Sequence, residues 1–373
     1  MESPPSLTSA PAQRLAQAIT AAGGWIGFER FMELALYTPG LGYYARGDQQ
    51  FGRMPGPAGS DFVTAPEMTP YFGRALAAQV VQALQVSDTC EVWEFGGGSG
   101  ALAEQLLHTL GERVRKYTIV DLSAALRERQ QQRLAPFGAQ VAWAGSLPMQ
   151  MRGVLLGNEL LDAMPVCLLH RVGGTWHERG VALGDGLQPV WEDRTGALRP
   201  PLEVEGGHDY LTEIHPHAEG FIRMLSDRLV QGAVFLIDYG FPEREYYHPQ
   251  RAMGTLMCHR AHRMDTDPLR EVGEKDITAH VNFTGLALAA QEASADCAPD
   301  AGLQLLGYTS QARFLMNCGI LSLLAGASLP DRAMAQKLLM EHEMGELFKV
   351  IAFCRGAPWD AIGFAQGDRS HTL

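Results

Sequence analysis

The sequence predicts an α/β fold built on a doubly wound sheet. Along residues 91–157, short apolar stretches typical of buried strands alternate with stretches of helical periodicity. Further apolar strands are predicted near 232–240 and 346–354. Polar clusters follow three of these strands, at 94–100, 158–162 and 238–240. Because ligands bind outside the carboxyl ends of the strands in open α/β sheets, we expect a binding site there.

The segment before the core is predicted to hold helices and one long loop. Helices are expected over 11–22, which a glycine pair ends, and over 28–36. Residues 40–66 are rich in glycine, proline and aromatic side chains, which favours a packed loop that closes as a lid. A third helix begins after Thr69 and runs to about residue 86.

The core elements follow as strand, helix, strand, helix, strand and strand, at 91–95, 99–110, 117–121, 123–134, 140–144 and 153–157. A β-hairpin is expected over 166–182 and a helix near 217–230. Residues 184–210 read as irregular, and 241–281 mostly as loop. The final third is expected to supply helices near 283–294, 310–325 and 330–342, and strands near 302–308 and 346–354.

We expect this chain of 373 residues to divide into four parts. They are an N-terminal helical cap and loop (1–87), a cofactor-binding core (88–165), an insertion with the hairpin (166–230), and the rest of the core (231–373) with a second insertion near 241–285. The inserted region is large enough to form the surface of a homodimer, although the sequence leaves the oligomeric state open.

Composition and charge argue against several classes of protein. Hydrophobic residues make up 46% of the chain and charged residues 19%, as in a well-cored globular protein. The net charge of −12 argues against a nucleic-acid partner and favours a cationic substrate. No apolar run reaches about 18 residues, so no membrane span is expected. The first residues lack the features of a signal peptide and of a clear transit peptide, which predicts a cytoplasmic protein.

The six cysteines are scattered without a Cys-x-x-Cys pair, which is typical of free thiols in a reducing compartment. The stretch from Cys258 to His262 combines cysteine and histidine. It has no second pair of ligands at metal spacing, so no metal site is expected.

A glycine cluster links the first core strand to its helix. Gly96 and Gly98 allow the backbone to turn sharply and to approach a ligand closely. Asp121, which ends the second strand, is placed to accept hydrogen bonds from ribose hydroxyls. A nicotinamide dinucleotide and S-adenosylmethionine both fit this layout. Glu94 would repel a pyrophosphate but attract a cationic methionine end, which favours the methyl donor.

Several motifs between about residues 28 and 354 resemble the MidA family, S-adenosylmethionine-dependent methyltransferases related to a mitochondrial complex I assembly factor. They are Phe31–Tyr37 with Gly42-Tyr43-Tyr44, Asp61–Glu67 with Phe72-Gly73, Asn158-Glu159 with Asp162–Val166, Ile237–Gly240, Asp276–Phe283, and Met344-Gly345 with Leu347-Phe348. The chain departs from the family pattern at Gly97, where proline is common, and at Ser60 and Ala65, where glycine and serine are common. None of these changes removes a group with obvious chemistry, so we expect cofactor binding to survive.

The resemblance implies a class I methyltransferase-like sheet with an N-terminal helical cap and inserted α/β segments. It implies S-adenosylmethionine as the cofactor and the arginine of a protein as the methyl acceptor. The relatives act on a respiratory complex I subunit and give symmetric dimethylarginine, so the same class of substrate is expected here.

Five further residues are candidates for the site. Glu159 and Asp162 are expected to hold and orient a guanidinium, although Asp162 could instead cap the following turn. Asn158 is expected to contact the cofactor or the substrate. By resemblance, Asp61 is expected to touch the methionine part of the cofactor or to close the lid, with plain turn chemistry as the alternative. His280 is expected to accept a proton or bind the substrate, with a packed, hydrogen-bonded histidine as the alternative.

Two other functions stay open on the sequence. A non-catalytic complex-assembly factor would bind the cofactor and a protein partner but would tolerate loss of Glu159 or Asp162, which are both present. A nicotinamide-dependent oxidoreductase is disfavoured by Glu94 and by the lack of a recognisable hydride-transfer constellation. Titration with NADH against S-adenosylhomocysteine separates the oxidoreductase from the methyltransferase.

Overall fold

The computed structural model describes residues 9–45, 63–260, 263–295 and 302–373. Its largest sheet has eight strands, seven of them in the order β15-β16-β10-β5-β2-β3-β4, with the short β14 paired to β10. The strands are β2 Glu91–Phe95, β3 Lys116–Val120, β4 Val141–Ala144, β5 Met151–Asn158, β10 Leu229–Phe241, β14 Val281–Asn282, β15 Leu303–Ser310 and β16 Phe348–Arg355.

The strand directions confirm the predicted fold class. Neighbouring strands from β4 to β10 run parallel, and β16 runs antiparallel between β10 and β15. The core begins at β2, and the next two strands in sequence, β3 and β4, are added on one side of it. The following strands, β5 and β10, are added on its other side, so the strand order reverses at β2. The sheet is therefore the doubly wound, class I methyltransferase-like sheet that the sequence predicted, and the reversal at β2 and β5 is where such a sheet binds its ligand.

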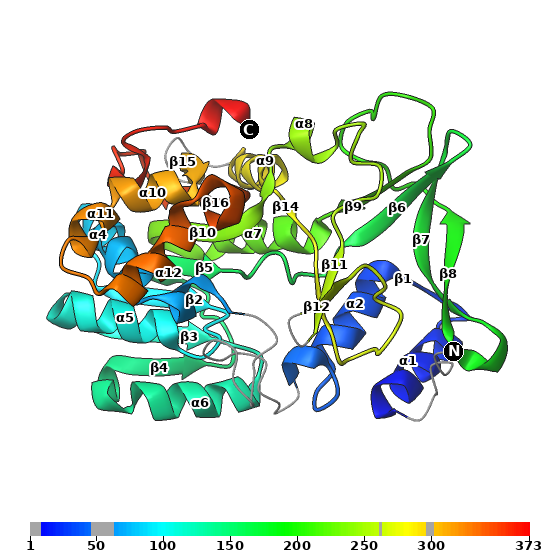
Figure 1. Cartoon of the computed structure of the whole chain (residues 1–373), viewed down its shortest axis with the longest axis horizontal. Coiled ribbons are helices and arrows are strands. Elements are labelled where there is room, and N and C mark those ends of the chain that lie inside the picture. The colour runs from blue at the N-terminus through cyan, green and yellow to red at the C-terminus, as the bar shows by residue number, and fades with distance from the viewer. Residues whose placement is uncertain (1–8, 46–62, 261–262, 296–301) are drawn as a thin grey trace.

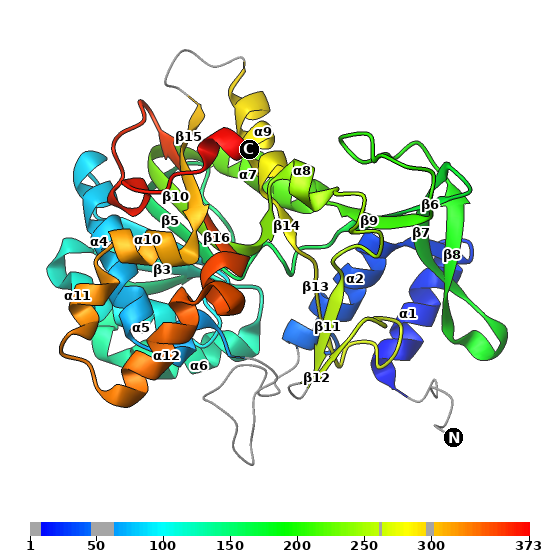
Figure 2. The ribbon, with the colours of Figure 1, turned by 45° about the horizontal axis from the view of Figure 1, so that its top comes forward.

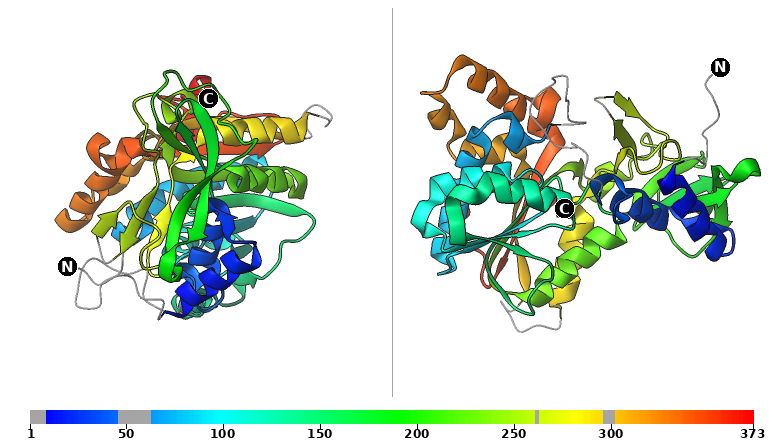
Figure 3. Two further views of the ribbon diagram at one scale, coloured as in Figure 1. Left: turned by 90° about the vertical axis from the view of Figure 1, so that its right-hand side faces the viewer. Right: turned by 90° about the horizontal axis from the view of Figure 1, so that it is seen from below.

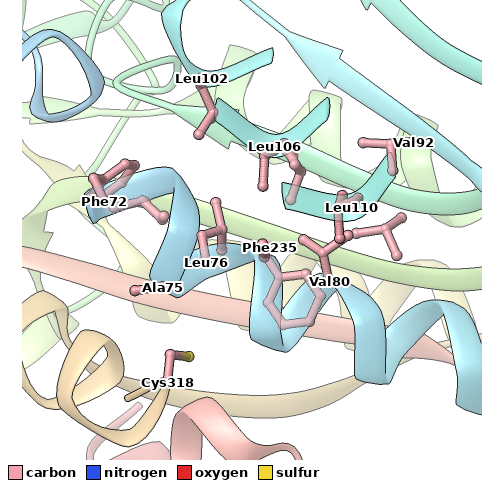
Figure 4. Close-up of a cluster of buried hydrophobic side chains, with 14 of the residues drawn as sticks. Phe72, Ala75, Leu76, Val80, Val92, Leu102, Leu106, Leu110, Phe235 and Cys318 are labelled. Carbon is pink, nitrogen blue, oxygen red and sulfur yellow. The ribbon is translucent and has the colours of Figure 1, made fainter. Parts of the chain in front are cut away.

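Helices cover both faces of this sheet (Figures 1 and 3). Alternate residues of β10 explain the two layers, because Phe235 packs with α4 and α5 while Val234 and Leu236 pack with α7 and α9. Figure 4 shows the first of these cores, where side chains of α4 and α5 meet β2 and β10. The helices of the chain are α1 Ala10–Ala21, α2 Phe28–Tyr37, α3 Ala65–Met68, α4 Tyr71–Val86, α5 Ala101–Leu110, α6 Ala124–Leu134, α7 Pro216–Arg228, α8 Glu243–Tyr246, α9 Phe283–Ser294, α10 Gln311–Asn317, α11 Ile320–Leu324 and α12 Leu329–Leu339.

A second, antiparallel sheet lies beside the first and carries the N-terminal helices (Figure 1). Its strands are β1 Trp25–Gly27, β6 Cys167–Val172, β7 Thr175–Leu183, β8 Pro189–Thr195 and β9 Tyr210–Ile214. Side chains of α1 and α2 pack on it through a core that includes Phe28, Phe31, Leu168 and Val181. The hairpin predicted over 166–182 is confirmed as the pair β6 and β7. It belongs to a five-stranded sheet, and one strand of that sheet, β8, lies in the stretch 184–210 that was predicted to be irregular.

A small third sheet stands between these two parts (Figure 2). It consists of β11 Met257–Arg260, β12 Arg263–Asp265 and β13 Asp276–Thr278, which pair antiparallel in the order β12-β11-β13. Its buried residues Cys258 and Ile277 share the core of α1 and α2. The sequence predicts mostly loop here, because strands of three or four residues show too short an alternation of apolar and polar residues to be recognised. In the described parts of the chain, no helix is long and apolar enough to cross a membrane.

Candidate active site

A cavity of about 1040 Å³ opens at the carboxyl ends of β2, β3, β5 and β10. Its opposite wall comes from the N-terminal part, through Tyr37 and Tyr44, and from the small sheet, through Met257 and Asp276. Sites for small molecules span roughly 300–1,000 Å³, so this cavity has room for a nucleoside cofactor together with a substrate side chain.

The glycine cluster forms the floor of the cavity next to β2. Gly96 and Gly98 have φ of +69° and +50°, the left-handed region that glycine adopts at least cost. A Cβ on Gly97 would lie 2.8 Å from Ile119 Cγ2, so a side chain there would collide with β3. The predicted close approach of backbone to ligand is thus available at this turn.

The cluster is clamped from the N-terminal side by Glu67 of α3. Its carboxylate accepts hydrogen bonds from the Ser99 hydroxyl and from Arg133 Nη1, the latter at 2.9 Å. Arg133 also donates to the Ser99 hydroxyl at 2.8 Å and to Glu104 at 2.8 Å. This connection between α3, α5 and α6 was not foreseen from the sequence.

Glu94 lies on β2 at the bottom of the cavity. Its side chain is 3% exposed and accepts a hydrogen bond of 2.8 Å from the Tyr117 hydroxyl. Burial raises the pKa of Glu94 to about 8, and the negative charge of Asp121 adds to this rise. The hydrogen bond from Tyr117 lowers the pKa, but by less. The carboxyl group is therefore mostly protonated at neutral pH until a cation arrives.

Asp121 directly follows β3 and lies beside the glycine cluster. One carboxylate oxygen accepts the Ser123 N–H at 2.9 Å, and the other accepts Gln130 Nε2 at 2.9 Å. Gln130, which is fully buried, also donates to the Gly98 carbonyl at 2.9 Å and accepts from Trp143. Gln130 thus fixes Asp121 and the glycine turn relative to each other. This role could not be predicted from the sequence, because Gln130 stands among other polar helix residues.

The turn from Glu159 to Asp162 is held by a buried carboxylate of β10. Asp238 Oδ2 accepts the backbone N–H groups of Leu160 at 3.1 Å, Leu161 at 2.8 Å and Asp162 at 3.3 Å. Its other oxygen accepts the Tyr239 N–H at 3.0 Å. Asp238 is fully buried and is a positioning residue for the turn that carries the two predicted catalytic acids.

Replacing Asp238 by alanine is expected to lower the free energy of unfolding by about 3 kcal/mol, because several buried N–H groups lose their acceptor. Urea denaturation of the cofactor-free protein measures this change. Asp227→Ala, at an exposed position of α7, is the control and is expected to leave the midpoint unchanged. A midpoint for Asp238→Ala equal to that of the parent protein would contradict this role.

Glu159 and Asp162 both line the cavity, as predicted. Glu159 has a φ of +50°, unusual for a residue with a side chain, which indicates that the turn is imposed by its surroundings. Its Oε1 accepts from Asn158 Nδ2 at 3.0 Å and from the Ala65 N–H at 3.4 Å. Burial raises the pKa of Glu159 to about 8, and the charge of Asp162 adds to the rise.

Asp162 is 5% exposed and accepts a hydrogen bond of 2.5 Å from the Tyr239 hydroxyl. Burial raises its pKa to about 6, while the Tyr239 bond acts in the opposite direction. Asp238, and not Asp162, accepts the backbone N–H groups of the turn that ends at Asp162. The alternative role of Asp162, a cap for the turn that follows it, stays a prediction.

Two acids that line the cavity, Glu33 and Asp276, were not among the predicted site residues. Asp276 on β13 is buried, lines the cavity, and accepts a hydrogen bond of 2.7 Å from the Tyr44 hydroxyl. Tyr44 stacks with Tyr37 at 5.6 Å between ring centroids, and Tyr37 donates to the Ala163 carbonyl at 2.7 Å. Asp276 belongs to a motif that was noted only as a family resemblance. It is separated from Tyr44 by 232 positions in the sequence, so their contact could not be predicted.

His280 lines the same cavity, with its ring edge-to-face between Tyr239 and Phe241. Burial lowers its pKa to about 4, and the charges of Arg251 and Lys349 lower it further. The ring is therefore neutral at neutral pH. Asp61, the remaining candidate, lies outside the described residues. Within those residues no group of three or more His, Cys, Asp or Glu side chains could hold a metal ion.

Comparison with known proteins identifies the family. A model of a family of S-adenosyl-L-methionine-dependent methyltransferases matches residues 75–299. A crystal structure from Burkholderia thailandensis, bound to S-adenosylhomocysteine, superposes with a TM-score of 0.91 at 48% identity, covering 98% of this chain and 96% of that one. The chain belongs to this methyltransferase family. S-adenosylmethionine, and not a nicotinamide dinucleotide, is therefore the cofactor of the methyltransferase, as predicted.

More distant relatives cover most of the methyltransferase. Protein arginine methyltransferase NDUFAF7 of Danio rerio is 26% identical over 352 residues, which make up 84% of this chain and 78% of the relative. The homolog of Caenorhabditis elegans is 26% identical over 334 residues, with 80% of this chain and 74% of the relative covered.

The cavity of the methyltransferase fits S-adenosylmethionine. Gly96, Gly97 and Gly98 line the cavity without a side chain, and Glu94 offers a buried carboxylate to a cationic group. Three buried lining atoms, Asn158 Oδ1, Asp162 Oδ1 and His280 Nδ1, make no hydrogen bond to any described residue. Buried polar atoms without partners are costly, so these atoms indicate positions that ligand groups complete.

Proposed function

We propose that this methyltransferase methylates an arginine side chain of a protein substrate. The charge of the cavity carries the proposal. None of its described lining residues is lysine or arginine, whereas six are acids, namely Glu33, Glu94, Asp121, Glu159, Asp162 and Asp276. Such a cavity attracts cations and disfavours anionic substrates. The names of the NDUFAF7 relatives, protein arginine methyltransferases, support the same substrate class.

When bound, S-adenosylmethionine supplies a methyl group on a sulfonium, open to in-line displacement. In the proposal, Glu94 accepts hydrogen bonds from the cationic methionine end and Asp121 accepts them from the ribose hydroxyls. Gly96 and Gly98 let the backbone approach the cofactor, and Asn158 contacts it through its unpartnered Oδ1.

Glu159 and Asp162 hold the guanidinium. An arginine side chain stays protonated in proteins, so the attacking nitrogen must lose its proton as the new N–C bond forms. A carboxylate whose pKa is raised is a better proton acceptor, and Glu159, at about 8, is the more basic of the two acids. The bound guanidinium favours the ionised form of Glu159. Ionised Glu159 takes the proton, while Asp162, fixed by Tyr239, orients the planar group.

His280 is proposed to contact the substrate rather than to act as the base. A pKa of about 4 makes its ring a weak proton acceptor at neutral pH. Its unpartnered Nδ1 can still accept a hydrogen bond from a guanidinium N–H.

The proposal is tested with S-adenosylmethionine labelled in the methyl group and a cell extract from a strain that lacks this chain. Labelled protein is hydrolysed, and the modified amino acid is identified by mass spectrometry. We expect methylarginine in at least one protein, formed at a rate lower by about 100-fold or more with the Glu159→Gln variant. Label only on lysine, carboxyl groups or small molecules would contradict the proposal, and no label at all would favour the non-catalytic assembly factor.

The motif resemblance extends the proposal to a subunit of respiratory complex I. Complex I purified from the parent strain is expected to carry a methylarginine that is missing from the deletion strain and restored by the intact gene. Identical arginine modification in both preparations would contradict this target while leaving arginine methylation of another protein in place.

A further inference from the structure

Four of the apolar side chains that line the cavity come from elements other than those that carry the proposed cofactor residues. We call this set the apolar rim: Met257, Met264, Met344 and Leu347. Two of them are strongly exposed, Met264 at 70% and Leu347 at 51%. Exposed large apolar side chains gathered at the opening of a cavity mark a surface that a ligand or partner covers.

The apolar rim comes from two separate parts of the molecule. Met257 and Met264 stand on β11 and β12 of the small sheet, and Met344 and Leu347 precede β16 of the main sheet. Figure 2 shows these two sheets as distinct bodies of the ribbon. A ligand that contacts both halves of the rim therefore bridges the small sheet and the main sheet. A polypeptide segment, which is longer than a single side chain, suits such a surface.

Leu122 also lines the cavity and is 86% exposed, but it does not belong to the rim. It directly follows Asp121, so it lies on the side of the proposed ribose contact. The four side chains of the apolar rim are thus available to contact the substrate.

The negative charge inside the cavity favours an arginine within a peptide over a free arginine. Glu159 and Asp162 stand in its wall, and none of its described lining residues is a lysine or an arginine. A free arginine would bring its own carboxylate into this field, which is unfavourable. An arginine within a peptide brings only the guanidinium, and its neighbours in the chain are left at the opening, where the rim is apolar.

We propose that the apolar rim docks a protein segment in which the target arginine is flanked by apolar residues. This inference rests on the proposed function, since it takes the guanidinium to occupy the acidic cavity. The guanidinium is recognised by charge, and the flanking side chains are recognised by burial against methionine and leucine. Methionine is flexible and polarizable, so the rim accepts apolar flanks of different shapes.

Peptide binding to protein saturated with S-adenosylhomocysteine tests the inference without requiring turnover. Three fluorescent peptides of equal length are compared by anisotropy: a central arginine with leucine and phenylalanine flanks, a central arginine with glycine flanks, and the apolar peptide with glutamine in place of arginine. The double variant Met264→Gln/Leu347→Ser removes the exposed half of the rim. Met253→Gln/Leu321→Ser is the matched control, because these residues are 82% and 58% exposed and do not line the cavity.

We expect the parent protein to bind the apolar arginine peptide about tenfold more tightly than the glycine-flanked one, as the burial of one or two apolar side chains provides. The rim variant is expected to lose this preference while keeping its affinity for S-adenosylhomocysteine and for the glycine-flanked peptide. The control variant is expected to keep it.

Equal affinity of the parent protein for the two arginine peptides would overturn the inference, as would an equal loss in both double variants. A different result would contradict the proposed function. In that case the glutamine peptide would bind as tightly as the apolar arginine peptide, which would mean that the cavity does not recognise the guanidinium.

Discussion

Replacing Glu159 by glutamine is expected to lower kcat for methyl transfer by about 100-fold or more, the usual effect of losing a group that moves a proton in the transition state. Glutamine keeps the size of the side chain and can still accept one hydrogen bond, but it neither balances the guanidinium charge nor takes its proton. Affinity for S-adenosylmethionine is expected to stay unchanged, because Glu94 and Asp121 are intact. Steady-state kinetics with an arginine peptide and calorimetric titration of the cofactor measure the two quantities.

The control for this variant is Glu219→Gln. Glu219 forms a surface pair with Arg223 at 3.2 Å on α7 and does not line the cavity, so its loss is expected to leave kcat unchanged. A Glu159→Gln enzyme with the kcat of the parent would rule out the proposed role. A loss of cofactor binding in the same variant would instead assign Glu159 to the cofactor.

Replacing Glu94 by glutamine is expected to weaken S-adenosylmethionine binding by about 10- to 100-fold, the range for one lost charge-assisted hydrogen bond at a buried site. Glu91→Gln is the matched control. Glu91 stands on the same strand but at its other end, where it pairs with Arg115 at 3.6 Å. Titration calorimetry at constant pH compares the three proteins, and equal affinity of Glu94→Gln and the parent would exclude Glu94 from the cofactor site.

The raised pKa of Glu94 gives this binding a pH dependence. With a pKa of about 8 the free protein carries a protonated Glu94 at pH 7, whereas a bound cation favours the ionised form. Affinity is therefore expected to rise with pH from 6 to 8, by at most about tenfold per unit, and to level off above the pKa. Glu159 titrates in the same range, so the measured quantity is the difference in slope between the parent and Glu94→Gln. Identical slopes for the two proteins would contradict the assignment.

The sequence alone predicts those site residues that lie at the ends of consecutive core strands. Glu94, Asp121 and Glu159 each follow or end an apolar stretch, and parallel strands bring their carboxyl ends to one edge of the sheet. Their convergence on one cavity could therefore be predicted before any coordinates. The glycine turn between β2 and α5 was equally local, because it depends on only a few neighbouring residues.

The remaining parts depend on contacts between distant segments, which a single sequence does not show. Tyr44 meets Asp276 across 232 positions, and Glu67 reaches Ser99 and Arg133 only because α3 packs on the glycine turn. Asp238 was noted within a motif, but its role as the acceptor for a whole turn follows from its burial beneath that turn. The small sheet escaped prediction for the same reason, since its short strands are specified by their pairing rather than by an alternating pattern.

The central claim is that the acidic cavity beside the cofactor site binds a guanidinium. A crystal structure of the protein with S-adenosylhomocysteine and an arginine peptide tests it most directly. We expect the guanidinium within about 3 Å of carboxylate oxygens of Glu159 and Asp162, with its nearest nitrogen facing the sulfur. A cofactor bound at the glycine turn with the arginine outside the cavity, or with Glu159 and Asp162 facing a different substrate group, would contradict it.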